Sequence, residues 1–312
     1  MTTRAAGIER VGLGLAALGR PAYINVGRGE LPADRTVEAM RAASWEVLDQ
    51  AYAAGVRWVD VARSYGLAEE FLAGWLDSRS PAGLTVSSKW GYAYVGEWRL
   101  DAPVHEVKEH SLARFTTQWA ETSALLGSAL SLYQVHSLTV DSPLFEDLAL
   151  QDALAALPVR VGFSTSGPRQ ADTVRRALEL ERHGERVFTA VQSTWNMLET
   201  SVGPALAEAH AAGAHVLVKE ALANGRLAVD PPKPVLDLAA SHHTTPDAVS
   251  LAAALSQPWA DTILLGPSSV PQLHANLTAQ SVTLTQPELT ELRALAEPPP
   301  TYWATRARLP WT

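Results

Sequence analysis

Short apolar runs alternate with longer amphipathic stretches from one end of the chain to the other. The apolar runs are nearly continuous, which is typical of strands that are buried on both faces. They predict strands at residues 11–16, 56–61, 84–88, 130–135, 159–164, 187–192, 214–219 and 261–266. The stretches between them have helical spacing and predict helices near residues 42–54, 67–78, 105–127, 146–156, 169–183, 202–212, 246–256 and 271–279. Strands that each precede a helix in this way predict an α/β fold, the (β/α)8 or TIM barrel.

Three stretches interrupt this alternation. Residues 20–40 follow the first strand and read as a long loop, and residues 228–237 are proline-rich and read as an ordered surface loop. Residues 297–312 form a tail rich in proline and aromatic residues. We see neither a solenoid-type repeat nor a linker, so we expect residues 1–312 to form a single domain whose tail packs near the barrel mouth.

Composition narrows the class of protein further. The chain has 312 residues, of which 47% are hydrophobic, and its net charge of −8 disfavours nonspecific binding to nucleic acid. It contains no cysteine, which excludes disulfides, thiolate metal sites and a thiol nucleophile. No apolar run approaches the roughly 20 residues of a membrane span, and the N-terminus lacks the apolar core of a signal peptide. We therefore expect a soluble cytoplasmic protein that binds neither membranes nor nucleic acid.

Four unlike polar residues lie at or just beyond the ends of successive predicted strands: Asp60, Tyr65, Lys89 and His136. The carboxyl ends of parallel barrel strands meet at one mouth, where such folds keep their chemistry. Taken singly, each residue has an ordinary structural explanation. Asp60 could cap a helix, and Lys89 could bury its aliphatic chain while its ammonium reaches solvent. Together they form a set that can donate a proton to a carbonyl oxygen at neutral pH.

These residues lie within a series of segments that resembles the aldo-keto reductase superfamily. In chain order the segments are GLGLAALG, DVARSYG, SSKWG, LYQVHS, VGFSTSG, VQSTWNMLE, VKEALANGRL and GPSSVPQLHANL. The resemblance implies that Tyr65 donates a proton to the substrate oxygen while hydride reaches the carbon. It implies that Lys89 lowers the pKa of Tyr65, that Asp60 holds Lys89, and that His136 orients the substrate.

The resemblance also implies a nicotinamide cofactor, because no side chain can supply hydride. Residue by residue, it assigns the carboxamide to Ser164, Thr165 and Gln192, with Thr165 standing where the family usually has asparagine. Lys219 stands where the family often has a stacking tyrosine. The remaining cofactor contacts implied by the family's motifs are Leu222, Gly266, Ser268, Ser269, Gln272 and Asn276.

The choice between NADP and NAD depends on the segment GPSSVPQLHANL, which contains Ser268 and Gln272. Members that prefer NADP usually carry Lys or Arg near Ser268 and at Gln272, to grip the 2′-phosphate. The neutral side chains here offer ordinary hydrogen bonds and no charge-assisted ones. We therefore expect preference for NAD, or use of both cofactors.

Aromatic residues gather in the loops expected at the mouth and in the tail. Among them, Tyr23, Trp90 and Tyr92 are the candidates for the substrate pocket, and Trp90 directly follows Lys89. Aromatic walls suit sugar faces, ring aldehydes and flat apolar compounds equally well.

Three hypotheses for function remain at this stage. The first is an NAD(P)-dependent oxidoreductase that interconverts a small carbonyl compound, such as an aldehyde, ketone or aldose, and an alcohol. The second is a nicotinamide-binding regulatory subunit with little turnover. The third is a metal-dependent lyase or hydrolase that uses Asp60, His136 and Glu220, although no ligand spacing supports a metal site. The oligomeric state and the direction of the reaction do not follow from the residues.

Overall fold

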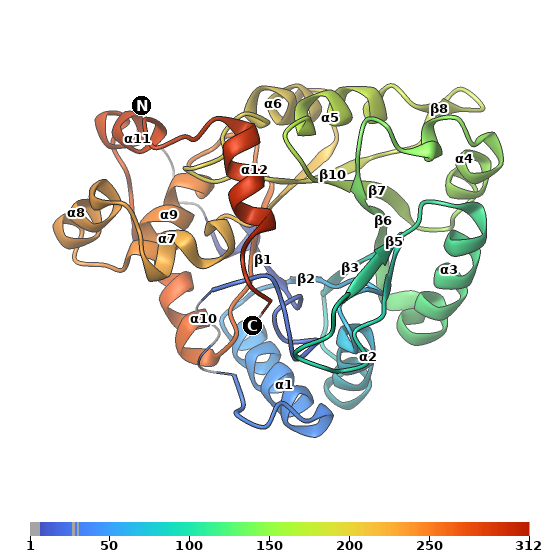
Figure 1. Cartoon of the computed structure of the whole chain (residues 1–312), viewed down its shortest axis with the longest axis horizontal. Coiled ribbons are helices and arrows are strands. Elements are labelled where there is room, and N and C mark those ends of the chain that lie inside the picture. Colours follow the sequence, from blue (N-terminus) through green and yellow to red (C-terminus); the bar gives the residue numbers. More distant parts are fainter. Residues whose placement is uncertain (1–6, 27–28, 30, 312) are drawn as a thin grey trace.

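Eight parallel strands close into a barrel in the computed structural model, which describes residues 7–26, 29 and 31–311. The strands neighbour one another in the order β1-β12-β11-β10-β7-β6-β3-β2 (Figure 1). Their bounds are Val11–Gly14 (β1), Trp58–Asp60 (β2), Thr85–Trp90 (β3), Leu130–Leu138 (β6), Arg160–Thr165 (β7), Ala190–Thr194 (β10), His215–Lys219 (β11) and Thr262–Leu265 (β12). Each lies within or overlaps a predicted strand, so the prediction of a single-domain (β/α)8 barrel is confirmed.

Helices surround the barrel and follow its strands along the chain (Figure 1). The helices at predicted positions are Val37–Ala53 (α1), Ala68–Arg79 (α2), Leu112–Leu126 (α3), Leu148–Ala155 (α4), Gln170–Leu178 (α5), Gly203–Ala211 (α6), Pro246–Leu255 (α9) and Val270–Leu277 (α10). The main hydrophobic core lies between the strands and these helices, and a small second cluster of Leu132, Ala190, Leu217 and Leu264 lies inside the barrel. None of the helices in the described part of the chain is both long and apolar enough to cross a membrane.

Two predicted helix boundaries are wrong because short antiparallel hairpins occupy part of the range. The helix expected over 105–127 begins only at Leu112, since Glu106–Lys108 (β5) pairs with Tyr92–Tyr94 (β4). The helix expected over 169–183 ends at Leu178, and a two-residue pair, Glu181–Arg182 (β8) with Glu185–Arg186 (β9), follows.

Helices also form in two proline-rich segments where no helix was expected, the predicted loop 228–237 and the tail. Lys233–Ser241 (α8) begins inside the supposed loop 228–237, after the short helix Arg226–Val229 (α7), and Pro299–Ala307 (α12) occupies most of the tail. In α8 and α12 the prolines stand in the first turn, where the missing N–H removes no helical hydrogen bond. A further helix, Gln286–Arg293 (α11), starts with a capping box formed by Thr285 and Glu288.

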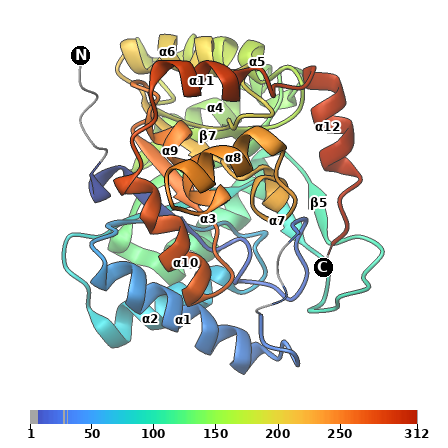
Figure 2. The same ribbon diagram turned by 90° about the vertical axis from the view of Figure 1, so that its left-hand side faces the viewer.

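The tail and the β4–β5 hairpin lie on the same side of the barrel, at the right of Figure 2. In α12, the Tyr302 hydroxyl accepts a hydrogen bond of 2.9 Å from Asn196 Nδ2, which ties the helix to the segment after β10. Beyond α12, the Trp311 ring stacks on the His105 ring with their centroids 4.4 Å apart. The tail thereby contributes side chains to the strand-exit side of the barrel.

Close packing joins the loop after β1 to the turn after β2. Gly19 O accepts a hydrogen bond of 2.8 Å from Leu67 N. A Cβ atom at Gly19 would lie 2.3 Å from the Tyr65 carbonyl oxygen and 2.4 Å from Ala68 Cβ. Only glycine therefore lets these two backbone segments approach.

We expect Gly19→Ala to lower the free energy of unfolding by about 3 kcal/mol, because an overpacked backbone contact must open. Urea denaturation followed by circular dichroism measures the change. Gly266→Ala is the matched control, since a Cβ there meets nothing within 4 Å, and it should change stability by no more than about 0.5 kcal/mol. Equal stability of the two variants would contradict the proposed close packing at Gly19.

Candidate active site

Asp60, at the end of β2, is the centre of a polar cluster inside the barrel. Its carboxylate forms an ion pair with Lys89 Nζ, and both side chains are almost fully buried. Lys89 Nζ also donates a 3.0 Å hydrogen bond to Val61 O. Asp60 Oδ1 accepts further hydrogen bonds from Ser87 Oγ at 2.7 Å, Gln134 Nε2 at 3.2 Å and Gln192 Nε2 at 3.1 Å. Three strands, β3, β6 and β10, thus contribute donors to one carboxylate on β2, because inward-facing residues at similar heights meet on the barrel axis.

Tyr65 and His136 lie directly above this cluster. The turn after β2 carries Tyr65, whose N–H donates to Ala62 O at 3.0 Å. The ring of Tyr65 meets that of His136 edge to face, with centroids 5.5 Å apart, and Lys89 Nζ lies 4.9 Å from the tyrosine ring centroid. The structure therefore brings the four predicted catalytic residues together at one place.

A local irregularity in β6 directs His136 toward this place. The pairing of β6 with β7 shifts register between Val135 and Leu138, and Ser137 has a φ of +52°. Bulges of this kind re-aim side chains beside active sites. The Nδ1 atom of His136 lies 3.3 Å from Ser64 Oγ, which fixes the orientation of the ring.

The electrostatics of the site differ from the expectation for Tyr65. Burial is the largest effect and raises the pKa of Tyr65 well above 10, and the Asp60 carboxylate raises it further, while Arg20 opposes them. The expected lowering by Lys89 is not seen, since Asp60 lies against that ammonium and the pair is nearly neutral as a whole. Burial also lowers the pKa of His136 well below 6.5, assisted by the positive charges of Lys89 and Lys219. At neutral pH the phenol is protonated and the imidazole is uncharged.

A second ion pair, with Arg20 buried and Glu106 partly buried, lies beside Tyr65. Arg20 NH1 donates to Glu106 Oε1 at 2.7 Å and to Ser64 O at 3.0 Å. The guanidinium carbon lies 5.3 Å from the Tyr65 ring centroid and 4.8 Å from that of Tyr23. The sequence analysis did not identify Arg20 and Glu106, because a single arginine in a loop and a glutamate in a distant hairpin carry no shared pattern.

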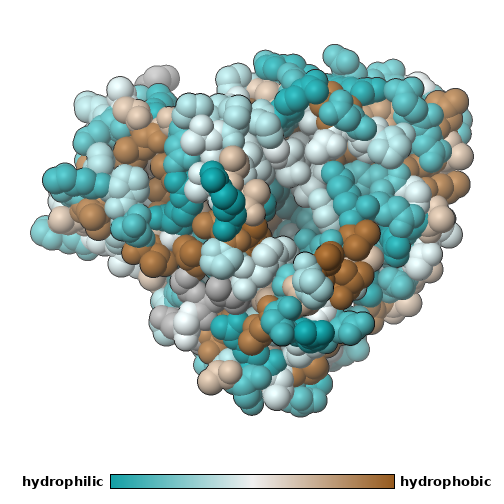
Figure 3. All heavy atoms as spheres, in the orientation of Figure 1, coloured by the Kyte–Doolittle hydropathy of each residue, from teal (hydrophilic) through white to brown (hydrophobic). Residues whose placement is uncertain are grey.

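A cavity of about 680 Å³ opens above these residues. The face seen in Figure 1 is hollowed near its centre in the space-filling view of Figure 3. Asp60, Tyr65 and His136 line one part of the cavity, while Asn276 of α10 and Leu251 of α9 line another. The volume lies within the range of about 300–1,000 Å³ that is usual for small-molecule sites.

Six of the predicted cofactor contacts line this cavity: Gln192, Lys219, Leu222, Gly266, Gln272 and Asn276. Four do not line it: Ser164, Thr165, Ser268 and Ser269. Thr165 is the clearest case, since its hydroxyl donates to Gln170 Oε1 at 3.0 Å on the helix side of the strand. Alternation along β7 explains the direction of Thr165, because neighbouring strand residues face opposite ways and Ser164 is the one that faces the barrel interior.

The other three serines have partners within the protein. Ser164 Oγ accepts a 2.8 Å hydrogen bond from Ser137 N. Ser268 donates through both its N–H and its hydroxyl to Gln272 Oε1, each at 2.9 Å. Ser269 is the N-cap of α10 and accepts from Gln272 N at 3.3 Å. These contacts stabilise the loop and helix that carry the serines.

A charged network lies at the cavity wall around Lys219 and Glu220. Arg306, from the C-terminal helix α12, forms an ion pair with Glu220, while Lys219 Nζ donates to Thr194 Oγ1 at 2.8 Å. Burial opposes ionisation of Glu220, but Arg306 and Lys219 outweigh it and lower its pKa to about 2. Burial is the largest effect on Lys219 and lowers its pKa to about 8, which Glu220 partly opposes.

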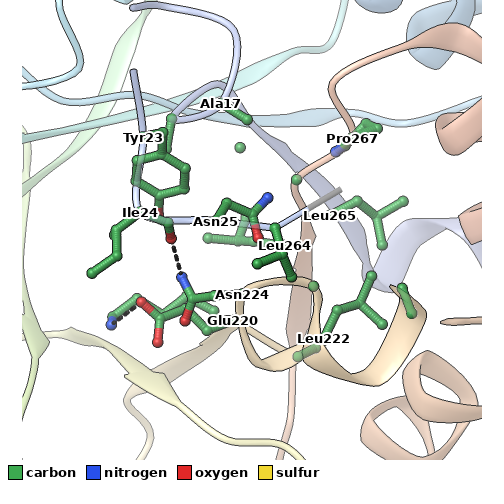
Figure 4. Close-up of a pocket in the computed structure, with 18 of the residues that line it drawn as sticks. Ala17, Tyr23, Ile24, Asn25, Glu220, Leu222, Asn224, Leu264, Leu265 and Pro267 are labelled. Atoms are coloured by element: carbon green, nitrogen blue, oxygen red, sulfur yellow. Dashed lines mark hydrogen bonds and ion pairs between the residues drawn. The ribbon is translucent and has the colours of Figure 1, made fainter. Parts of the chain in front are cut away.

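The loops that follow β1 and β11 meet at the cavity, since only β12 separates these two strands in the barrel. Figure 4 shows Tyr23 and Asn25, from the loop after β1, facing Leu222 and Asn224, from the segment after β11. Asn224 Nδ2 donates to Ile24 O at 2.9 Å, and Asn224 O accepts from Val26 N at 3.0 Å. The buried Oδ1 atom of Asn224 has no hydrogen-bond partner among the residues that the structure describes. A buried acceptor without a partner at a cavity wall is consistent with a bound molecule that donates a hydrogen bond to it.

Of the predicted substrate-pocket aromatics, Tyr23 and Tyr92 line the cavity and Trp90 does not. The Trp90 ring is fully buried against Phe115 of α3, with centroids 5.1 Å apart. Lys89 faces the barrel interior, so the next residue along the strand faces the helices. The assignment of Trp90 to the pocket wall was therefore wrong.

The residues of the metal-dependent hypothesis do not form a ligand set. Asp60 is engaged by Lys89, and Glu220 by Arg306. Within residues 7–26, 29 and 31–311, no group of three or more His, Cys, Asp or Glu side chains is arranged to hold a metal ion. The geometry gives that hypothesis no support.

Comparison with known proteins identifies the family. The family model for the aldo/keto reductase family matches residues 10–297. The chain belongs to the aldo/keto reductase family. This confirms the resemblance seen in the sequence, and the family as a whole carries out NAD(P)-dependent oxidation and reduction of carbonyl compounds.

Solved structures share the fold across almost the whole chain. An aldo-keto reductase from Bacillus halodurans in its holo form matches with a TM-score of 0.66 at 21% identity, covering 93% of this chain and 92% of the other. The glycerol dehydrogenase of Gluconobacter oxydans matches with a TM-score of 0.67 at 21% identity, covering 92% and 90%. A search of curated proteins gives no match. At this level of identity the solved structures show the fold alone.

The buried pair of Asp60 and Lys89 leads to a stability prediction. Asp60→Asn leaves the Lys89 ammonium buried without a counter-charge, so we expect a loss of about 3–5 kcal/mol in the free energy of unfolding. The double variant Asp60→Asn/Lys89→Met removes both charges and should recover part of this loss. Urea denaturation of the wild type, both single variants and the double variant measures the coupling. Additive effects of the two changes would contradict a buried ion pair.

Proposed function

We propose that this protein is an NAD(P)-dependent oxidoreductase that interconverts a carbonyl compound and the corresponding alcohol, with Tyr65 as the proton donor and acceptor. The observation that carries the proposal is the placement of the Tyr65 phenol at the cavity, between the His136 ring and the paired Lys89 ammonium. A bound nicotinamide dinucleotide supplies the hydride that the side chains cannot.

The cavity suits such a dinucleotide in its chemistry. Gln192 offers an amide near Tyr65, and Lys219 and Arg306 offer positive charge at the wall. Asn276 of α10 offers a second amide in another part of the cavity. These residues, with Leu222 and Gly266, would hold the dinucleotide, and the unpartnered Asn224 acceptor agrees with a ligand rich in donors.

Proton transfer depends on the raised pKa of Tyr65. A protonated phenol donates to the substrate oxygen when the carbonyl is reduced, and the neighbouring charges determine how readily the phenolate takes a proton back in oxidation. The uncharged His136 has Ser64 Oγ near Nδ1, so a proton on Nε2 is free to face the substrate oxygen. Tyr65 and His136 would then hold the same oxygen from two directions.

Polar and aromatic groups together favour a hydroxylated substrate. Tyr23, Tyr92 and Trp311 present aromatic faces to the cavity, and the Arg20–Glu106 pair presents a donor and an acceptor beside Tyr65. Aromatic faces pack on the C–H faces of a sugar or polyol while charged groups bind its hydroxyls. We therefore favour an aldose, a hydroxyaldehyde or the related alcohol as the substrate.

Replacing the phenol tests the reaction directly. We expect Tyr65→Phe to lower the rate of carbonyl reduction by about 100- to 10,000-fold, the usual contribution of a general acid, while dinucleotide binding is kept. Absorbance of the reduced nicotinamide, followed with a panel of hydroxyaldehydes and aldoses, gives the rate. Tyr133→Phe is the matched control, because Tyr133 is a buried tyrosine that contacts Thr122 on the helix side and does not line the cavity.

The alternative of a regulatory subunit makes a different prediction for the unmodified protein. It would bind NADH or NADPH yet turn over none of the panel, and Tyr65→Phe would change nothing. Turnover by the wild type together with its loss in Tyr65→Phe alone contradicts that alternative.

Lys219 makes cofactor binding dependent on pH. Its pKa of about 8 means that the ammonium forms as the pH falls through 8 and is lost as the pH rises. A dinucleotide carries a negatively charged pyrophosphate, so we expect its dissociation constant to rise about tenfold from pH 7 to pH 9.5. Quenching of tryptophan fluorescence measures binding. The Lys219→Met variant should bind the dinucleotide weakly at all these pH values. The Lys233→Met variant, whose changed residue is exposed, should bind it as the wild type does. If Lys219→Met kept the pH dependence of the wild type, the role of Lys219 in cofactor binding would be contradicted.

A further inference from the structure

A buried carboxylate lines the cavity beside α10, and the family resemblance assigns it no role. Asp247 stands in the first turn of α9 and is only 9% exposed. Asn276 Nδ2 of α10 donates to its Oδ2 at 2.6 Å. No lysine, arginine or histidine among the described residues forms an ion pair with it, in contrast to Asp60, Glu106 and Glu220. In the described part of the chain, Asp247 is therefore a carboxylate of the cavity wall without an ion-pair partner.

The position of Asp247 relative to Tyr65 indicates what it would meet. On the proposed function, on which this inference rests, the nicotinamide reacts beside Tyr65. The adenosine part must then extend elsewhere in the same cavity, and Asp247, Asn276 and Gln272 are the polar lining residues contributed by α9 and α10. The two common dinucleotides differ only at the 2′ position of this adenosine ribose, which carries a hydroxyl in NAD and a phosphate in NADP.

The chemistry of a carboxylate separates these two groups. An ionised carboxylate only accepts hydrogen bonds, and after binding Asn276 it retains acceptor capacity for a ribose hydroxyl. A phosphate carries about −1.5 to −2 charges near neutral pH and also only accepts, so it can form no hydrogen bond with Asp247 and is repelled by it. Burial strengthens this repulsion, because a low-dielectric surrounding screens charges less than water does.

Among the described residues that line the cavity beside α10, no side chain offers a positive charge that would offset the repulsion. Gln272 Oε1 already accepts two hydrogen bonds from Ser268. Neutral serine and glutamine side chains alone would allow both NAD and NADP to bind. The carboxylate of Asp247 in addition disfavours NADP. We propose that Asp247 is a specificity-determining residue that selects NAD(H) over NADP(H) at the adenosine ribose.

A purely structural role for Asp247 is the competing explanation. A carboxylate in the first helical turn interacts favourably with the helix dipole, and the bond to Asn276 joins α9 to α10. Loss of that role would lower stability without changing the ratio of the two affinities. The ratio of dissociation constants is therefore the informative quantity.

The experiment is a fluorescence titration of the full chain with NADH and with NADPH. The wild type should bind NADH at least about tenfold more tightly than NADPH, a difference of about 1.4 kcal/mol. Asp247→Asn keeps the shape and an acceptor for Asn276 and removes the charge, so the ratio should fall about tenfold, chiefly through tighter NADPH binding. Asp172→Asn is the matched control, because Asp172 stands in the first turn of α5 and does not line the cavity; its ratio should equal that of the wild type.

A second measurement needs no variant and so does not depend on the folding of Asp247→Asn. Adenosine 5′-diphosphate should displace NADH from the wild type at a concentration about tenfold lower than its 2′-phosphorylated counterpart requires. Equal competition by the two fragments, or an unchanged ratio in folded Asp247→Asn, overturns the role of Asp247. Failure of the wild type to bind either dinucleotide would instead contradict the proposed function.

Discussion

The ion pair between Asp60 and Lys89 is the constraint on which the site depends. An ammonium inside a barrel is costly unless a carboxylate lies against it, and a carboxylate there needs further hydrogen bonds. Ser87, Gln134 and Gln192 supply those hydrogen bonds from β3, β6 and β10. The barrel interior therefore has a polar layer next to the hydrophobic cluster of Leu132, Ala190, Leu217 and Leu264. Tyr65 and His136 rest on this rigid polar layer.

Burial has a larger effect on the pKa values of Tyr65 and His136 than any single neighbouring charge. Lys89 lies 4.9 Å from the Tyr65 ring, yet the pKa of the phenol is raised, because desolvation and the Asp60 carboxylate dominate. The same burial keeps His136 uncharged. At neutral pH the phenol is therefore protonated and the imidazole uncharged, and Arg20 is the cation that most favours the phenolate.

Segments outside the repeating strand–helix units complete the mouth. Arg20 comes from the loop after β1, Glu106 from the β4–β5 hairpin and Arg306 from the C-terminal helix α12. Each forms a buried or half-buried ion pair, so the loops are held in place by charge as well as by apolar contacts. This division fits a barrel in which the strands carry the chemistry and the loops shape the substrate site.

The sequence by itself determined the barrel and the four converging residues. Apolar runs of strand length between helical stretches are local patterns, and parallel strands bring their carboxyl ends together whatever the details of packing. The positions of Trp90 and Thr165 were also within reach of the sequence, since strand alternation sends the neighbours of Lys89 and Ser164 outward. The prolines at the starts of α8 and α12 kept both helices from being predicted. Proline breaks a helix when it stands in the interior, but it is well tolerated in the first turn. Only the tertiary structure decided the direction of the Tyr65 pKa, the Arg20–Glu106 pair and the place of Asp247 in the cavity wall. These depend on burial and on contacts between residues far apart in the chain, and no local pattern of residues records either.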